Sequence, residues 1–421
     1  SDCFTDYLAT FADMIIQLEM EFDKGLDAKR LAKAVDLTLD AEPVLGCRFI
    51  NNSYKPYFQR LDTDKRLAFF TANSENEYEA FKSASIDRQN GPQINVCLWH
   101  STKGDRLLLK VAHQVADAAG VKDIAAILCR IYRQLASDPQ YRPVPNTKGT
   151  RSLLQVLRHV PLHAYPRIYL NFMQSSWRTS KPRTVHTLSI PDGPIESLIY
   201  ITRLIPAVRV STLAEYGHSH NATLNDIIAA ASLRAIADTG NWNKRSHLSL
   251  STTIDLRRYI PSGRAAAVAN LGNFGLEWPD LGTDPGQDFA ATLDKVAAIT
   301  RHGKMHWIGL DIMFSPVIPL CKFMPHARGK ELYRKYFEAG IKKHTCTHWF
   351  TNTGLIEPES VNFGMQPTTA CIMPQQCYPY MPFIFGLSGY NGMLTLAAGA
   401  YPTQKEIIDK FFDAILKELP A

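Results

Sequence analysis

The chain has 421 residues and eight cysteines, but no pair of them has Cys-x-x-Cys spacing. No group of Cys and His has zinc-finger spacing, and Cys47, Cys97 and Cys129 lie in apolar periodic segments, where a thiol behaves as a small hydrophobic group. Glycine-rich phosphate loops and the Gly-x-Ser-x-Gly motif are also missing. These absences argue against a structural zinc site, a P-loop enzyme and a serine hydrolase. They also predict reduced cysteines and no cysteine nucleophile.

Long apolar runs and a strong charge of one sign are lacking as well. No stretch approaches the length of a membrane span, and no basic segment followed by an apolar one predicts a secretory signal at the first residues. The net charge of +6 is small for this length, so it favours an anionic ligand or local basic patches over nucleic acid. With 45% hydrophobic and 20% charged residues, the chain has globular composition. We expect a cytoplasmic, monomeric protein with no nucleic-acid partner.

Helix and strand patterns alternate along the chain, which predicts an α/β or α+β protein whose sheets are covered by helices. Residues 15–22 alternate apolar and polar side chains as a half-buried strand does, and Asp27 is placed to cap a following helix that Pro43 ends. Strands at 94–100 and 106–112, joined by a turn at 103–105, predict a hairpin, and a helix follows at about 121–135. We expect further strands at 46–51, 55–60, 184–190, 197–205 and 247–253, further helices at 208–216, 224–237, 288–301 and 403–419, and short strands over 346–399.

Residues 137–186 differ from the rest and predict a crossover between two halves. The segment opens with a proline-rich loop, and residues 151–186 contain six Lys or Arg and no Asp or Glu. We therefore expect an amino-terminal subdomain over residues 1–180 and a carboxy-terminal one over 181–421. Residues 301–345 are also basic and aromatic.

The two basic stretches leave alternatives open. Their Lys and Arg side chains fit either the phosphates of a ligand such as coenzyme A or an ordinary solvated surface. The aromatic segments 160–177 and 305–327 fit either lids that touch a lipid or a membrane surface, or core packing.

His113 stands where an apolar strand ends, and Asp117 follows four residues later among small residues. A strand end projects its side chain from a rigid platform, and small neighbours let a substrate approach. A free imidazole has a pKa of about 6.5, so its neutral form can take a proton from a hydroxyl or an amine. Asp117 fits a group that orients the imidazole, a group that holds the loop through an ion pair, or only a helix cap. The pair predicts His113 as a general base.

Residues 112–118, Ala-His-Gln-Val-Ala-Asp-Ala, resemble the His-His-x-x-x-Asp-Gly motif of the chloramphenicol-acetyltransferase-like superfamily. That superfamily includes nonribosomal-peptide condensation domains, wax-ester synthases and alcohol acyltransferases. Weaker similarities follow in family order over nearly the whole chain, at 43–49, 225–226, 255–257, 270–275 and 351–356. Ala112 and Ala118 replace the first His and the Gly of the motif. Alanine at 118 narrows the loop and would be awkward if that position needs a positive φ.

The resemblance implies two similar subdomains with mixed sheets and an active-site tunnel between them. It implies an acyltransferase in which acyl-CoA, or a phosphopantetheine thioester on an acyl carrier protein, meets an alcohol or amine acceptor at His113. No cofactor is expected to stay bound, and no covalent acyl-enzyme is required. Asp117 would pair with Arg257 in a structural role. The oxyanion would be met by a backbone amide near Gly120 or by the side chains of Asn352 and Thr353. The alternative is a non-catalytic binding or scaffold protein on the same fold.

His344 and His348 are the one pair whose spacing suggests a shared metal, on one face of a strand. No third ligand is evident nearby, so the sequence favours an exposed strand edge and predicts no metal site.

Overall fold

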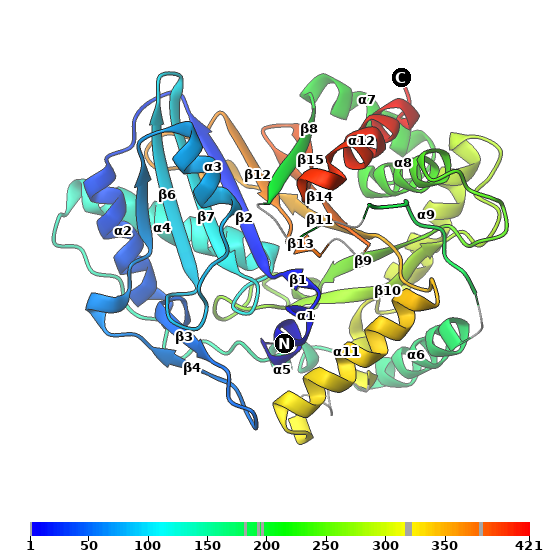
Figure 1. The fold of residues 1–421 in the computed structure, drawn as a ribbon, viewed down its shortest axis with the longest axis horizontal. Helices are drawn as coiled ribbons and strands as arrows, with labels where there is room; N and C mark the ends of the chain where they lie inside the picture. Colours follow the sequence, from blue (N-terminus) through cyan, green and yellow to red (C-terminus); the bar gives the residue numbers. More distant parts are fainter. Residues whose placement is uncertain (1, 181–182, 192–193, 195–197, 316–321, 379–381) are drawn as a thin grey trace.

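Two β-sheets, one on each side of the molecule, form the framework of this computed structural model (Figure 1). The structure describes residues 2–180, 183–191, 194, 198–315, 322–378 and 382–421. Both sheets are mixed, because β5 runs parallel to β6 and β11 runs parallel to β9 and β14, whereas the other neighbouring strands are antiparallel. The predicted class, α/β with mixed sheets and covering helices, is confirmed.

The first sheet is built mainly from the amino-terminal half. Its strands, in spatial order, are β12 (Thr369–Met373), β2 (Ile15–Phe22), β7 (Gly104–Ala112), β6 (Ile94–Ser101) and β5 (Phe69–Ala72). The predicted hairpin is present as β6 and β7. Gly104 has a φ of 128°, and a Cβ there would collide with the carbonyl oxygen of Phe22, so the turn requires glycine.

Helices cover both faces of the first sheet. On one face, α2 (Ala28–Ala41) and α4 (Ala118–Ser137) bury Val35 and Leu128 in a cluster with Leu18 of β2. On the other face, α3 (Glu75–Ser83) buries Tyr78 against Cys97 and Leu108. Asp27 caps α2 as predicted, accepting a hydrogen bond from the backbone amide of Arg30.

The second sheet belongs to the carboxy-terminal half. Its strands, in order, are β10 (Gly272–Asp280), β9 (Ser249–Asp255), β11 (Trp349–Leu355), β14 (Ile384–Tyr390), β15 (Met393–Ala400) and β8 (Ile199–Ile205). The helices α7 (Ala207–Ser219), α8 (Leu224–Thr239), α9 (Phe289–Met305) and α12 (Lys405–Glu418) lie on this side of the molecule (Figure 1). Ile228 of α8 and Phe411 of α12 share a buried cluster with Phe385 of β14.

Further elements join the two halves. The crossover contains α5 (Leu154–Leu157), a 3-10 turn η3 (Leu162–Ala164) and α6 (Tyr165–Ser180), and Ile168 of α6 packs with Ile254 and Leu271 of the second half. The helix α1 (Asp2–Leu8) packs against α11 (His326–Lys342), and the carboxylate of Asp6 contacts Nε2 of His326 and Nζ of Lys330, each at 2.9 Å. Two small ladders, β1 (Ala12–Asp13) with β13 (Gln376–Cys377) and β3 (Cys47–Ile50) with β4 (Tyr57–Arg60), complete the strands.

Two expected elements differ from the structure. The strand predicted over 184–190 is wrong: this segment makes one isolated bridge, between Val185 and His247, and buries Leu188 without joining a sheet. The expected strand over 344–348 is also wrong, because His344 has a φ of 51° in the turn after α11 and β11 begins at Trp349. Residue 197, where the next strand was expected to begin, lies outside the described residues. In the part of the chain that is described, no helix combines the length and hydropathy of a membrane span.

Candidate active site

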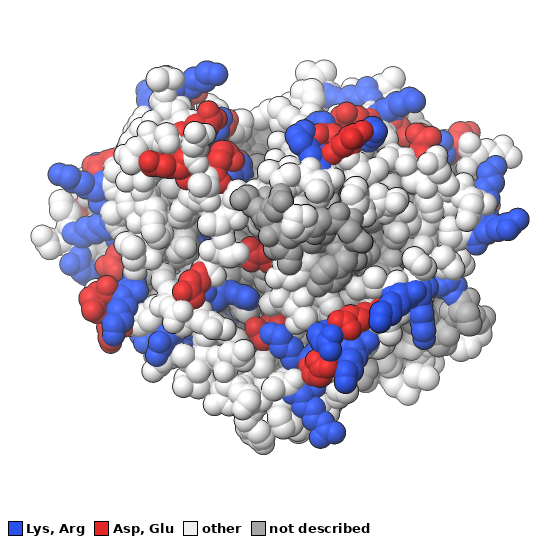
Figure 2. Space-filling view, in the orientation of Figure 1, with Lys and Arg blue, Asp and Glu red and all other residues white. Residues whose placement is uncertain are grey.

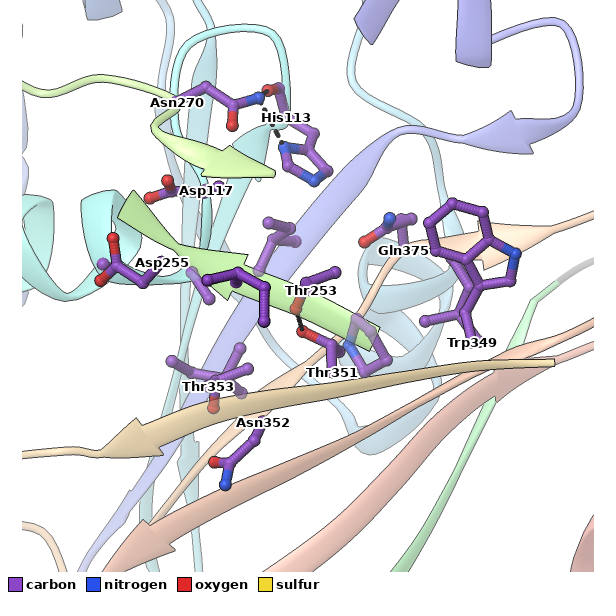
Figure 3. A pocket seen from close by; sticks show the side chains of 18 of the residues that line it. His113, Asp117, Thr253, Asp255, Asn270, Trp349, Thr351, Asn352, Thr353 and Gln375 are labelled. Atoms are coloured by element: carbon purple, nitrogen blue, oxygen red, sulfur yellow. Dashed lines mark hydrogen bonds between the residues drawn. The ribbon is translucent and has the colours of Figure 1, made fainter. Parts of the chain in front are cut away.

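A pocket opens between the two sheets, where the end of β7 faces the second half of the chain (Figure 3). The first half contributes Ile16 of β2, His113, and residues 117–119 at the start of α4. The second half contributes residues 253–255 at the end of β9, residues 270, 272 and 273 at the start of β10, and residues 349 and 351–353 of β11. Ile372, Pro374, Gln375 and Ile384 complete the lining. The predicted base therefore lies between the two halves.

His113 is 7% exposed, and its imidazole lines this pocket. The ring atom Nδ1 lies 3.0 Å from the carbonyl oxygen of Ala116. A carbonyl oxygen can only accept, so Nδ1 carries the hydrogen and Nε2 keeps its lone pair. Burial lowers the pKa of His113, and the nearby Asp117 carboxylate only partly opposes that shift. The imidazole is therefore neutral near pH 7 and able to accept a proton.

Asn270 holds the backbone of His113 from the other half of the chain. Its Nδ2 donates to the carbonyl oxygen of His113 at 2.9 Å. The same nitrogen lies 3.2 Å from Nδ1 of the ring, to which it cannot donate while Nδ1 carries the hydrogen. The same amide donates to Oγ1 of Thr5 in α1, at 3.2 Å. The backbone amide of His113 in turn donates to the carbonyl oxygen of Met14. Contacts on several sides therefore fix the direction of the imidazole.

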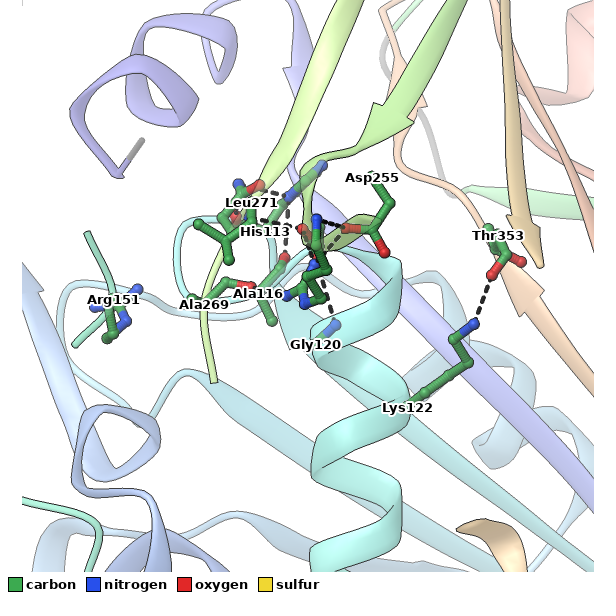
Figure 4. Close-up of polar contacts among 12 residues, drawn as sticks. His113, Ala116, Gly120, Lys122, Arg151, Asp255, Ala269, Leu271 and Thr353 are labelled. Atoms are coloured by element: carbon green, nitrogen blue, oxygen red, sulfur yellow. Dashed lines mark hydrogen bonds and ion pairs between the residues drawn. The ribbon is translucent and has the colours of Figure 1, made fainter. Parts of the chain in front are cut away.

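Asp117 and Arg257 form a buried ion pair across the two halves. Figure 4 shows this region, with Gly120 and Leu271 labelled. Nη1 of Arg257 lies 2.8 Å from Oδ2 of Asp117, and the backbone amide of Leu271 donates to the same oxygen at 2.7 Å. Arg257 also donates through Nη2 to the carbonyl oxygen of Ala269 at 2.8 Å. The pairing expected from the resemblance is thus present, and it joins the first turn of α4 to the turn after β9 and to residues 269–271, which lead into β10.

Each member of this pair stabilises the charged form of the other. Burial raises the pKa of the Asp117 carboxyl. The Arg257 charge and the hydrogen bonds that the carboxylate accepts together lower this pKa by more than burial raises it, so the net pKa is below its ordinary value. Burial likewise disfavours the charged guanidinium, and Asp117 more than offsets this, so the pKa of Arg257 is raised. Both groups are therefore ionised. Asp117 faces Arg257 and the backbone, so its role here differs from that of a carboxylate that orients the histidine.

Gly120 is wrongly placed for the predicted oxyanion contact. Its backbone amide already donates to Oδ1 of Asp117 at 2.9 Å, because Asp117 is the N-cap of α4. Gly120 is buried, and a Cβ there would lie 3.0 Å from the carbonyl oxygen of Ala269. The missing side chain lets the two halves approach closely, and the amide has no capacity left for a substrate.

Asn352 and Thr353 do line the pocket, but their polar atoms are partly used (Figure 3). Nδ2 of Asn352 donates to Oδ1 of Asn225 at 3.0 Å, and Oγ1 of Thr353 donates to the carbonyl oxygen of Leu387 at 3.0 Å. The carbonyl oxygen of Thr353 accepts from Nζ of Lys122 in α4 at 2.7 Å. Thr353 therefore links α4 to β11, whereas Asn352 keeps one amide hydrogen.

Sequence reasoning missed a pair of hydroxyls on the same wall of the pocket. Oγ1 of Thr253 and Oγ1 of Thr351 lie 2.8 Å apart. Within such a pair one hydroxyl donates and the other accepts, so the accepting hydroxyl keeps its own hydrogen for a ligand. Thr351 lies in a segment that the resemblance highlighted and Thr253 lies two residues before another, but their pairing depends on β9 and β11 lying side by side.

The two departures from the family motif have simple local explanations. Ala118 is the first residue of α4 and is not among the residues with positive φ, so alanine causes no backbone strain there. Ala112 is fully buried at the end of β7.

His344 and His348 do not come together as a metal pair. His344 is exposed in a turn, while His348 is buried and its Nε2 accepts a hydrogen bond from the backbone amide of Leu188 at 2.8 Å. Among the described residues no group of three His, Cys, Asp or Glu is placed to hold a metal. The described cysteines Cys47, Cys97, Cys129, Cys346, Cys371 and Cys377 are free thiols, and burial raises the pKa of Cys346 to about 11.

Comparison with known proteins identifies the fold. No protein-family model matches the chain, and no curated protein matches its sequence. Solved structures match it over nearly its whole length, and they share the chloramphenicol-acetyltransferase-like fold of condensation domains. This chain therefore has that fold, as its sequence predicted.

Three of these structures illustrate the range of proteins that share the fold. Polyketide synthase associated protein 5 from Mycobacterium tuberculosis is 15% identical, with a TM-score of 0.64 over 98% of this chain and 95% of that one. The first condensation domain of the CDA synthetase is 16% identical, with a TM-score of 0.66 over 99% and 95%. A trichothecene 15-O-acetyltransferase from Fusarium sporotrichioides is 10% identical, with a TM-score of 0.68 over 99% and 93%.

Proposed function

We propose that this protein is an acyltransferase that moves an acyl group from a thioester to an alcohol or an amine, with His113 as the general base. The observation that carries the proposal is the imidazole of His113, whose Nδ1 donates to the carbonyl oxygen of Ala116, so that Nε2 is the ring nitrogen left to accept a proton in the pocket. The fold, which an O-acetyltransferase and condensation domains share, supports the same class of reaction.

In the proposed reaction Nε2 of His113 takes the proton of the acceptor hydroxyl or amine as its oxygen or nitrogen attacks the thioester carbonyl. The tetrahedral intermediate then collapses, the carbon–sulfur bond breaks, and the imidazolium returns the proton to the leaving thiolate. The products are an ester or amide and a free thiol, so no other reactant is needed. Placing both substrates in one pocket and supplying a base would account for the rate.

For the oxyanion we propose the hydroxyl pair of Thr253 and Thr351. The two residues belong to adjacent strands of the second sheet and line the same pocket as His113, whereas the Asn352 side chain points to the other face of β11, toward Asn225 of α8. Donors fixed by a sheet need little reorganisation when charge develops.

The donor is proposed to be acyl-CoA or the phosphopantetheine thioester of a carrier protein. Similar structures include a nonribosomal peptide synthetase and a polyketide synthase associated protein, which supports a carrier partner without deciding between the two donors. The apolar lining, with Ile16, Ile254, Ile372 and Ile384, fits the hydrocarbon part of an acyl group. A monomeric state and a cytoplasmic location stay predictions.

The proposal is tested by measuring free-thiol release from a panel of acyl-CoA donors, with and without small alcohols and amines. We expect release that depends on an acceptor for at least one donor, with the ester or amide detected by mass spectrometry. The donors tested include thioesters loaded on carrier proteins. If folded protein gives no product with any pair of donor and acceptor, the acyltransferase proposal is rejected in favour of a non-catalytic scaffold protein.

The pH dependence of the reaction follows from the burial of His113. Because the pKa of the folded imidazole is lowered, the base form persists to lower pH than in a free histidine. With an alcohol acceptor, kcat/KM is expected to be level near pH 7 and to fall on the acid side, with a midpoint below the ordinary value of about 6.5. A pH series of initial rates measures it. A midpoint above the ordinary value would contradict the buried, neutral base.

A further inference from the structure

Helix α6 turns an apolar stripe toward solvent. Leu170, Met173 and Trp177 follow one another at helical spacing and are 52%, 47% and 61% exposed, and Leu162 in the preceding turn is 86% exposed. The opposite side of the helix packs in the core, because Ile168 is fully buried in a cluster that includes Leu310 of η5 (Leu310–Phe314). The side of α6 that packs in the core is therefore separate from the exposed stripe. We call Leu162, Leu170, Met173 and Trp177 the α6 face.

The surroundings of the α6 face are basic. Arg158 and Arg167 are exposed on the same segment, and residues 151–186 contain no acid. Nδ2 of Asn171 donates to the carbonyl oxygen of His306 at 2.7 Å, which ties α6 to the end of α9, where Lys304 and Met305 are exposed. The turn η5 packs against α6 and contains one acidic residue, Asp311. In the view of Figure 2, Lys and Arg side chains are visible toward the lower right, beside the region where Figure 1 places α6.

We propose that the α6 face binds an anionic lipid surface, with α6 lying in the plane of the interface. Leucine, methionine and tryptophan on one side of a helix, flanked by arginine, form the pattern of helices that insert their apolar side into the headgroup region. Helix α6 lies at the periphery of the molecule (Figure 1), so it is placed to reach a flat surface. A lipid surface matches both features of this face, because it takes up apolar side chains and carries negative charge.

Vesicle binding tests this without any substrate, so its failure leaves the proposed acyl transfer untouched. Wild-type protein is floated with vesicles of phosphatidylcholine alone and of phosphatidylcholine mixed with phosphatidylglycerol. We expect binding to the mixed vesicles, and a decrease of about tenfold or more in the variant L162Q/L170Q/M173Q. The matched control L67Q/V144Q/V208Q removes three apolar side chains of similar exposure elsewhere (68%, 90% and 82%) and should bind like wild type. Melting temperatures of both variants show that each is folded.

Charge is tested separately with R158Q/R167Q, which should weaken binding to the mixed vesicles about fivefold per arginine at low salt. Three results would overturn the proposal. The wild type fails to float with anionic vesicles, the α6 variant floats as well as the wild type, or light scattering shows a dimer that the α6 variant abolishes. The last result would assign the face to contact between copies of this chain.

Discussion

Replacing His113 with alanine is expected to lower the turnover of acyl transfer by about two to four orders of magnitude while the fold survives. The imidazole is the group in the pocket with a fixed lone pair, because Nδ1 is used by the carbonyl oxygen of Ala116 and Asn270 holds the neighbouring carbonyl. Without it, the acceptor proton must go to water. Initial rates of thiol release and of product formation measure the loss.

His218→Ala provides the matched control, because His218 is an exposed histidine on α7. Its turnover should equal that of the wild type, and circular dichroism of both variants should be unchanged. A third variant, His113→Gln, keeps a polar side chain of similar size and removes the base, so it should be as slow as His113→Ala. Near-normal turnover in either His113 variant would reject the assignment of the base.

Asp117→Ala is expected to destabilise the protein by about 3–5 kcal/mol, a loss visible as a large drop in melting temperature. Arg257 is 4% exposed, so its charge would stay buried without the carboxylate that now faces it. The backbone amides of Gly120 and Leu271 would lose their acceptor as well. Thermal unfolding measures the loss.

Asp255→Ala serves as the control for the same arginine. Oδ1 of Asp255 lies 3.1 Å from Nη1 of Arg257, but the Asp255 side chain is 50% exposed, so its loss should cost about 1 kcal/mol or less. If the two variants melt at the same temperature, the Asp117 pair does not hold the two halves together.

The pH dependence of the difference between wild type and Asp117→Ala follows from the lowered pKa of Asp117. A carboxyl whose folded pKa lies below its unfolded value contributes stability that is complete above the unfolded pKa of about 3.9 and is lost as the pH falls through the folded pKa. The difference in stability should therefore be constant near neutral pH and shrink in strong acid.

Local patterns predicted those parts of the site that lie close together in the chain. His113 and Asp117 are four residues apart at a strand end, so one motif revealed both, and the family resemblance linked Arg257 to them. A local rule could also have prevented the wrong prediction of Gly120 as an oxyanion contact. An aspartate at the start of a helix normally accepts from the amide two or three residues later, and this rule, applied to Asp117, would have removed Gly120 from the oxyanion candidates.

Residues that reach the site through tertiary contacts could not be found in this way. Asn270 meets His113 across 157 positions, and Thr253 meets Thr351 across 98, through strand pairing that no local pattern encodes. The wrong prediction of a strand over 184–190 also reflects tertiary contacts that the local sequence does not encode. Val185 and Leu188 are buried as strand residues are, but a strand also needs a neighbour, and here the pairing stops after one bridge.

The strand β12 has a consequence for how this protein can be dissected. Its five residues come from near the carboxyl terminus yet pair with β2 in the first sheet, from Thr369 opposite Glu21 to Met373 opposite Gln17. A fragment ending near residue 180 would lack this partner and leave the backbone of β2 open along that edge, a template for aggregation. Dissection at the midpoint of the chain should therefore yield insoluble material, and co-expression of both pieces should restore solubility.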